Sequence, residues 1–127
     1  AHHPTEIKVV LDGVNKVYNG YDKVCVFQPH RISRLKDLKK EFSYAFQDAD
    51  TVILCPIYTA GEKIKLGFSY LDFAKEIIKN SKVKLFLVDN DVQLAKFIKK
   101  NMYGKKIVIG MGAGSVSNMM KKLPLLI

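Results

Sequence analysis

The chain alternates short apolar or β-branched runs with longer segments of helical periodicity, and this alternation is what most restricts its fold. The runs are five or six residues long and end close to Pro, Gly or Asp, as strands do. Between them, apolar residues recur at helical spacing, first at Ile7, Val10, Leu11 and Val14. We expect strands over residues 23–28, 51–55, 83–88 and 106–111, and helices from Pro4 to the Asn19-Gly20 turn and over 33–46, 68–79, 91–100 and 116–122.

The lengths of the connections decide how these strands pair. Parallel neighbours need a crossover of a dozen or so residues, which a helix supplies, and such crossovers are right-handed. The sequence therefore predicts an α/β fold: a three-layer, Rossmann-like sandwich around a mostly parallel sheet of at least four strands. With 127 residues, the chain 1–127 is expected to form a single domain. Ligands of such sheets bind at the loops after the strands, here 28–34, 56–67, 89–91 and 110–117.

Apolar pattern and cysteine use exclude several classes of function. No apolar run approaches the eighteen residues of a membrane-spanning helix, and no signal peptide opens the chain, so we expect a soluble, intracellular protein without a membrane partner. Cys25 and Cys55 each lie in a strand-like run, and we interpret them as buried thiols. Since no set of residues shows the spacing of metal ligands, we expect no metal site.

The formal net charge of +9 raises the question of a nucleic-acid partner. The lysines, however, are spread over the expected helix faces, where a solvated surface is their usual role, and no nucleic-acid motif accompanies them. We therefore expect no nucleic-acid partner. A basic nucleic-acid binder stays an alternative, which salt-dependent retention on DNA or RNA would reveal.

The two arginines of the chain, Arg31 and Arg34, stand together in Gln-Pro-His-Arg-Ile-Ser-Arg at 28–34. This segment follows an expected strand and enters an expected helix, so both guanidinium groups would lie near outward-facing backbone N–H groups. Such a place suits a phosphate or a carboxylate, which arginine binds through two parallel hydrogen bonds that lysine cannot make. The alternative is that one arginine forms a salt bridge with a nearby carboxylate and the other is merely exposed.

A glycine-rich segment, Gly-Met-Gly-Ala-Gly-Ser at 110–115, follows the last expected strand. Such a turn lets the backbone approach a ligand closely. It differs from a dinucleotide fingerprint, which follows the first strand of its fold. The chain also lacks a P-loop of the form Gly-x-x-x-x-Gly-Lys-Ser/Thr, so we expect it to share any nucleotide triphosphate with another domain.

Two further segments leave alternatives open. The adjacent His2 and His3 point in different directions and make a poor metal pair, so a phosphate-contacting or helix-capping role is favoured. In the loop at 56–62, Tyr58 and Glu62 face the same crevice in one interpretation. In the other, Tyr58 is a packing lid.

Four segments in this order resemble a known family. They look like the C-terminal domain of the UDP-N-acetylmuramate:L-alanine ligases, within the Mur ligase family, and the resemblance covers nearly the whole chain. Related ligases tend to carry His-Asn-Pro or a lysine-bearing motif at the first position, and murein tripeptide recycling ligases lack the second motif. The segments are Ala-His-His-Pro-Thr-Glu-Ile at 1–7, Val-Phe-Gln-Pro-His-Arg-Ile-Ser-Arg at 26–34, Asp-Ala-Asp-Thr-Val-Ile-Leu with Pro-Ile-Tyr-Thr-Ala-Gly-Glu at 48–62, and Gly-Met-Gly-Ala-Gly-Ser at 110–115.

The resemblance implies the last of three domains in a cytoplasmic enzyme of peptidoglycan synthesis. The N-terminal domain would bind the UDP-sugar, and a central ATPase domain would bind ATP and magnesium. That enzyme would join L-alanine to UDP-N-acetylmuramate through an acyl phosphate. The resemblance also implies roles for single residues: His2 on the phosphate side of ATP, Arg31 and Arg34 on phosphate or the alanine carboxylate, and Gly112, Ala113, Gly114 and Ser115 near the amino acid.

One departure from the family pattern concerns the start of the chain. The family motif normally has an acidic residue and an aromatic residue before Ala-His-His-Pro, and this chain begins just after them. We therefore expect an excised domain that is inactive by itself. The alternative from another functional class is a stand-alone anion- or nucleotide-binding regulatory module.

Overall fold

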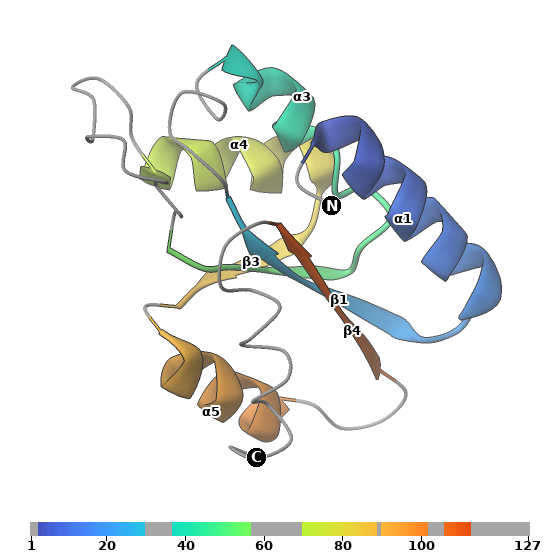
Figure 1. Ribbon diagram of the computed structural model, residues 1–127, viewed down its shortest axis with the longest axis vertical. Coiled ribbons are helices and arrows are strands. Elements are labelled where there is room, and N and C mark those ends of the chain that lie inside the picture. The colour runs from blue at the N-terminus through green and yellow to red at the C-terminus, as the bar shows by residue number, and fades with distance from the viewer. Residues whose placement is uncertain (1–2, 30–36, 57–69, 89, 102–105, 113–127) are drawn as a thin grey trace.

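A four-stranded parallel sheet forms the centre of the described part of the chain (Figure 1). The computed structural model describes residues 3–29, 37–56, 70–88, 90–101 and 106–112. All three strand pairs are parallel, so the predicted α/β fold is confirmed. The strands are β1 (Asp22–Gln28), β2 (Thr51–Leu54), β3 (Lys84–Leu87) and β4 (Lys106–Gly112), in the spatial order β3-β2-β1-β4.

The register of the strands sorts their side chains onto two faces. Cys25 of β1 pairs with Val52 of β2 and with Ile109 of β4, and all three belong to one core. Their neighbours Val26 and Ile53 pair with each other and belong to a second core. Because side chains alternate along a strand, both faces of the sheet are apolar, as expected for a parallel sheet covered on both sides.

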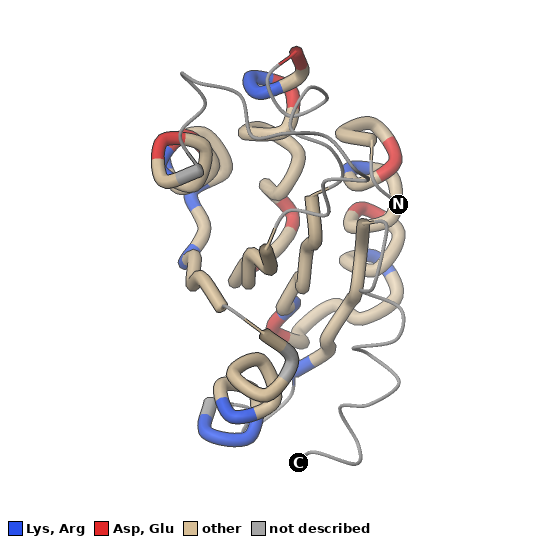
Figure 2. Tube along the Cα trace, turned by 60° about the vertical axis from the view of Figure 1, so that its left-hand side comes forward, with Lys and Arg blue, Asp and Glu red and all other residues tan. Residues whose placement is uncertain are grey.

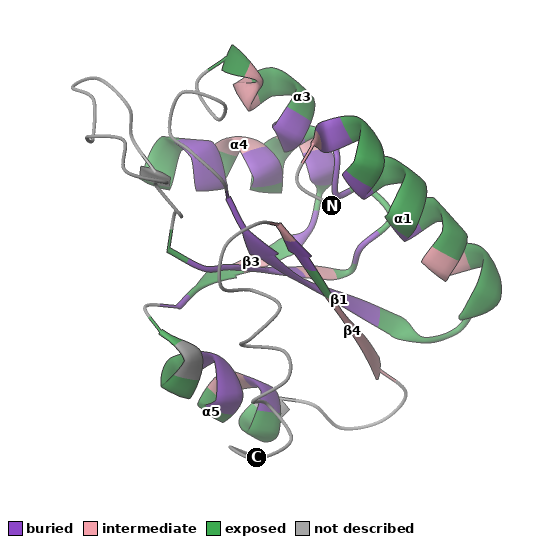
Figure 3. Ribbon diagram, in the orientation of Figure 1, coloured by how far each residue is buried: buried purple, intermediate pink, exposed green. Residues whose placement is uncertain are grey.

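Helices cover both faces of the sheet and complete the three predicted layers. Helices α1 (Pro4–Val17), α3 (Lys39–Ser43) and α4 (Tyr70–Ser81) contribute to the first core, and α5 (Asp91–Asn101) contributes to the second. In Figure 1, the first three lie above the sheet and α5 lies below it. Figure 3 shows that the buried residues of these helices lie mostly on the sides that face the strands.

The two cores differ in composition. Below α1, α3 and α4, the rings of Phe27, Phe42, Phe46 and Phe73 are completely buried. The centroid of the Phe27 ring lies 5.7 Å from that of Phe42 and 5.3 Å from that of Phe46. The buried members of the second core are aliphatic apart from Cys55. Since each such phenylalanine contributes about 1.5–3 kcal/mol by burial, the aromatic core supplies much of the stability.

Helix α1 begins where the sequence predicts. His3 caps it, because its Nδ1 accepts a hydrogen bond from the Thr5 N–H at 3.2 Å. Pro4 fills the first helical position, where no N–H donor is needed, and Glu6 lies in the first turn, where a negative charge suits the helix dipole. The helix-capping role proposed for the histidine pair is thus confirmed for His3.

The helix expected over 33–46 is interrupted at Leu38, and it is wrong at its carboxyl end. Helix α3 covers only Lys39–Ser43, and the chain continues as turns to residue 48. A longer helix would need the Ser43 carbonyl and the Phe46 N–H for its own hydrogen bonds. Instead, the hydroxyl of Ser81 donates to the Ser43 carbonyl at 2.5 Å and accepts from the Phe46 N–H at 3.2 Å. A side chain of α4 therefore ends α3, which helical periodicity alone cannot predict.

The bounds of α4, α5 and the four strands differ from the predicted ones by at most two residues. Residues 33–36, residues 68 and 69 and the helix expected at 116–122 lie outside the described residues. Within the part of the chain that is described, no helix is long and apolar enough to cross a membrane.

Strand β3 is less buried than its apolar sequence suggests. It forms one end of the sheet order, and Phe86 and Leu87 leave 41% and 45% of their surface exposed. The Phe86 ring packs on Phe97 of α5, with their centroids 4.6 Å apart. The exposure follows from the position of β3 in the sheet, which depends on strand order rather than on local sequence.

Candidate functional site

The carboxyl ends of β1 and β4 mark the place where the chain reverses its direction across the sheet. After β1, the chain adds β2 and then β3 on one side, and it returns to place β4 on the other side of β1. In open parallel sheets, ligands bind in the crevice outside the strand ends at such a reversal. The loops that follow β1, β2 and β4 all leave the sheet at this edge.

Gln28, the last residue of β1, joins the ends of β1 and β2. Only 6% of its surface is exposed, and its Nε2 donates to the carbonyl oxygen of Pro56 at 3.3 Å. Just before this contact, the N–H of Cys55 donates to the carbonyl of Phe27 at 2.9 Å. The segments that follow β1 and β2 therefore leave the sheet from hydrogen-bonded positions.

Gly112 ends β4 beside Gln28, at a place that only glycine fits. The two residues pair in register, and the φ of Gly112 is +123°. A β carbon at this position would overlap the carbonyl oxygen of Gln28, and the backbone conformation is one that other residues rarely adopt. Gly112, Gln28 and Pro56 thus form a fixed series along the carboxyl edge, which we call the strand-end row.

The start of α1 lies at the same edge of the sheet. Helix α1 packs on the sheet through Ile7 and Leu11, and a short turn leads from Val17 to the start of β1 at Asp22. The helix therefore runs opposite to the strands, and its first turn points toward their carboxyl ends (Figure 1). A helix N-terminus carries a partial positive charge, which favours a bound anion.

Charge is distributed unequally along the strands. Figure 2 shows charged residues at the starts of β1 and β4 and none at the ends of these strands. The starts carry Asp22, Lys23 and Lys106, whereas the ends are Gln28 and Gly112. At the carboxyl edge the described residues thus offer shape and hydrogen bonds, and any strong charge would come from the residues that follow.

Most of the predicted site residues lie outside the described part of the chain. Gly112 is described and stands in the strand-end row; Arg31 follows Gln28 by three residues, and Ala113 follows Gly112 directly. The ligand contacts of all these residues stay predictions. Those outside the described residues are His2, Arg31, Arg34, Tyr58, Glu62, Ala113, Gly114 and Ser115.

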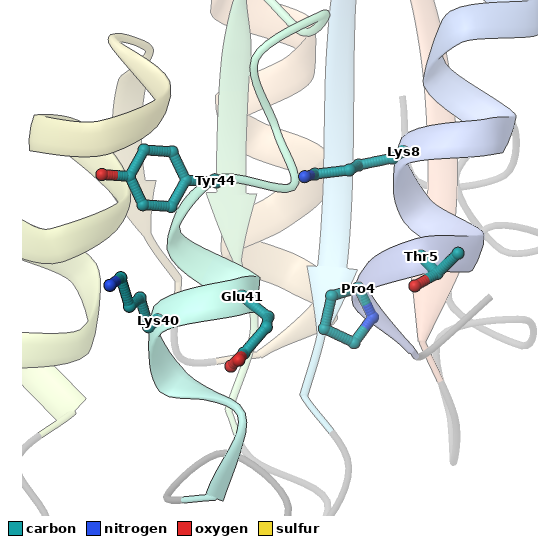
Figure 4. Close-up of a pocket in the computed structure, with 6 residues that line it drawn as sticks. All are labelled: Pro4, Thr5, Lys8, Lys40, Glu41 and Tyr44. Carbon is teal, nitrogen blue, oxygen red and sulfur yellow. The ribbon is translucent and has the colours of Figure 1, made fainter.

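A groove of about 330 Å³ between α1 and α3 was not predicted from the sequence. In Figure 4, Lys8 extends from α1 toward α3, and Lys40, Glu41 and Tyr44 of the facing segment lie across from it. Its lining includes two lysines and one glutamate, but the side chains of Lys40 and Tyr44 point away from Lys8 (Figure 4). Each segment lines the groove with residues i, i+1 and i+4. Any exposed helix face shows this spacing, so the sequence pattern could not have indicated the groove.

The two thiols are buried, as predicted, and burial lowers the fraction of each that is thiolate at neutral pH. Burial raises the pKa of Cys55 to about 11. Burial, together with the nearby Cys55, raises the pKa of Cys25 further. Because the thiolate is the reactive form, both groups should react slowly while the chain is folded. Among the residues that the structure describes, no three His, Cys, Asp or Glu side chains come together as metal ligands.

Comparison with known proteins adds the family. No protein-family model matches the chain. The UDP-N-acetylmuramate–L-alanine ligase of Pelagibacter ubique is 68% identical over 127 residues, which are the whole chain and 27% of that protein. The ligase of the same name from Bartonella bacilliformis is 34% identical over 123 residues, 97% of this chain and 26% of its own length. The crystal structure of the UDP-N-acetylmuramate–alanine ligase of Thermotoga maritima matches with a TM-score of 0.73 at 23% identity, over 98% of this chain and 24% of that one.

The fold and the sequence matches agree on the class of protein. The chain belongs to the Mur ligase family. Within that family, its sequence groups it with the UDP-N-acetylmuramate–L-alanine ligases, as the four motifs predict. The chain spans about a quarter of the length of the curated relatives that it matches.

Proposed function

We propose that the chain is the C-terminal domain of an ATP-dependent UDP-N-acetylmuramate:L-alanine ligase of cytoplasmic peptidoglycan synthesis. The observation that carries this proposal is the 68% identity, over all 127 residues, with the Pelagibacter ubique ligase. In the proposed enzyme, an N-terminal domain binds UDP-N-acetylmuramate and a central domain binds ATP and magnesium. This chain completes the site on the side where L-alanine enters.

The proposed reaction joins the alanine amine to the muramoyl carboxylate through an acyl phosphate. Negative charge gathers on phosphoryl and carboxylate oxygens, and donors that are held in place beforehand stabilise such charge most effectively. We assign this task to Arg31 and Arg34, whose guanidinium groups bind phosphate or carboxylate through paired hydrogen bonds. His2 lies on the phosphate side in this proposal, and the loop 112–115 lies near the amino acid.

The described residues support an orienting role rather than a nucleotide cradle. The strand-end row gives a fixed base to the loops after β1, β2 and β4, and the start of α1 favours an anion beside it. The chain has no P-loop, and its described residues form no cluster of metal ligands. ATP and magnesium would therefore be held mainly outside this chain, and we expect the isolated chain to be inactive and to bind ATP weakly.

A domain exchange tests the proposal. The 127 matched residues of the Pelagibacter ubique ligase are replaced by this chain, and phosphate release that depends on both L-alanine and UDP-N-acetylmuramate is measured. We expect turnover within about tenfold of the parent ligase, because a tenfold change is only about 1.4 kcal/mol in the barrier.

The control for the exchange is the same chimera with Arg31→Ala and Arg34→Ala. This double variant should fold but fail to ligate alanine, and calorimetry on the isolated chain should detect no micromolar binding of ATP. A well-folded chimera without alanine-dependent turnover would overturn the proposal.

A further inference from the structure

We propose that Gln28 is a positioning residue, whose side-chain amide fixes the arginine-bearing loop after β1 relative to the loop after β2. The inference rests on the proposed function, in which Arg31 and Arg34 bind phosphate and the alanine carboxylate. Gln28 acts through these arginines and not on the reacting atoms.

A glutamine at this position is not explained by packing. The side chains of residues 23–28 in β1 are all buried. Residues 24–27 are apolar, whereas Gln28, which follows them, is polar. Burying an amide costs free energy unless the amide is hydrogen-bonded. Methionine or leucine would fill a similar volume without that cost, so the hydrogen bond from the Gln28 Nε2 to the Pro56 carbonyl at 3.3 Å is one reason for a glutamine here.

The bond is made where the backbone ladder between β1 and β2 stops. The last rung is the hydrogen bond from the Cys55 N–H to the Phe27 carbonyl. The next rung would run from the N–H of residue 29 to the Cys55 carbonyl, and Pro29 has no N–H to donate. The side chain of Gln28 reaches the Pro56 carbonyl instead, and so it extends the connection between the two segments by one residue beyond the ladder.

The other side of Gln28 is held by β4. Gly112 packs so tightly on the carbonyl of Gln28 that a β carbon would not fit between them. Gln28 is thus fixed on both sides, and Arg31 follows only three residues later. We therefore expect a displacement of Gln28 to displace Arg31 as well, and a misplacement of about 1 Å in an active site can cost on the order of 100-fold in rate.

Two substitutions remove the bond, and one provides a matched control. Gln28→Met keeps the length of the side chain and removes the donor. Gln28→Glu keeps the shape and replaces the donor with an acceptor. The control is Gln47→Glu, because Gln47 also donates its Nε2 to a backbone carbonyl, that of Asn80 at 3.5 Å, but it is exposed and lies on the turn after α3.

The first measurement uses the 127-residue chain itself. It contains two arginines, so the NMR signals of their side-chain Nε–Hε groups report directly on Arg31 and Arg34. We expect both signals to shift in Gln28→Met and Gln28→Glu and to stay in place in Gln47→Glu. Unchanged signals in both Gln28 variants, or equal shifts in the control, would overturn the inference.

The second measurement uses the chimeric ligase. Gln28→Met should raise the KM for L-alanine at least tenfold while the KM for UDP-N-acetylmuramate stays within twofold. A merely structural role would reduce the amount of active enzyme, which lowers kcat and leaves both KM values unchanged. If Gln28→Met does not fold, Gln28→Glu takes its place.

The two proposals fail in different ways. A chimera that folds and does not ligate alanine refutes the proposed function, and the arginine signals still decide the role of Gln28. An active chimera whose Gln28 variants keep the parental KM for alanine refutes the positioning role and leaves the proposed function intact.

Discussion

The two edges of the sheet are built in different ways. At the amino edge, the Asp50 carboxylate accepts from the Lys23 N–H at 2.7 Å and lies 3.9 Å from the Lys23 Nζ, which donates to the Tyr21 carbonyl at 2.9 Å. At the carboxyl edge, the described residues at the ends of β1 and β4 are uncharged, and an amide and a glycine hold the strand ends. The amino edge satisfies its own charges, whereas the carboxyl edge fixes the loops that leave it.

This difference assigns different tasks to the two edges. Asp50 also bonds through its backbone to Lys23 and Lys84, so it joins the starts of β1, β2 and β3. Charges that are already paired inside the chain have little left to offer a ligand. We therefore expect substitutions at the amino edge to change only the free energy of unfolding, and substitutions at the carboxyl edge to change the site as well.

The largest effect is expected at Gly112. In Gly112→Ala, the new β carbon meets the carbonyl of Gln28 and the positive φ becomes strained, so β4 must move away from β1. We expect a loss of about 3 kcal/mol in the free energy of unfolding, measured by urea denaturation.

Gly13→Ala is the matched control for Gly112→Ala. Gly13 lies inside α1, and a β carbon there has no atom within 4 Å. The control should stabilise the chain by about 1 kcal/mol, because alanine favours a helix interior over glycine. Equal effects of the two substitutions would show that the close approach at the carboxyl edge is absent in solution.

A smaller effect is expected at the amino edge, from Asp50→Ala. The substitution leaves the Lys23 N–H and ammonium without their carboxylate partner. We expect a loss of about 1–2 kcal/mol, because the edge is partly open to water. The NMR signals of the arginine Nε–Hε groups should stay in place. A shift of these signals would contradict the separate tasks that we assign to the two edges of the sheet.

Most of the fold could be predicted from the sequence, because local patterns determine it. Apolar runs and helical spacing locate all four strands and the start of α1 at Pro4. The end of α3 could not be predicted, since it depends on the Ser81 hydroxyl, which is distant in sequence. The exposure of Phe86 could not be predicted either, because it follows from the place of β3 at the end of the sheet, which local sequence does not reveal.

The candidate site was predictable to a different degree. The parallel fold places the loops at one edge, and the motifs select Arg31, Arg34 and the loop at 112–115 within them. The sequence suggested only a ligand approach for Gly112, and the structure adds its contact with the Gln28 backbone. The link from Gln28 to Pro56 crosses 28 positions of sequence and leaves no local pattern.

Exchange of the two arginines that follow β1 in the sequence should affect activity more than stability. In the chimeric ligase, Arg34→Lys keeps the charge and loses the paired hydrogen bonds, so we expect at least a tenfold fall in kcat/KM for L-alanine, about 1.4 kcal/mol. Arg31→Lys should act on the phosphate side and lower kcat. Steady-state kinetics and melting temperatures of both variants test this. Parental kinetics in both would mean that the pair is an exposed salt-bridge site.

The smallest effect concerns the thiols, whose positions contrast the middle of a strand with the carboxyl edge. Cys25 lies within β1, and Cys55 is the first residue after β2. Burial raises the pKa of Cys55 from 9.0 to about 11, so its thiolate fraction at neutral pH is about 100-fold lower than that of an exposed thiol. Because the folded state holds the Cys55 proton more tightly than the unfolded state, the stability that this proton contributes is complete below pH 9 and is lost as the pH rises through 11.

At pH 8, alkylation followed by mass spectrometry should modify Cys55 before Cys25, since the strand ends open more readily than the strand centre. Denaturant should make the two rates equal, and faster modification of Cys25 in the folded chain would contradict the expected order.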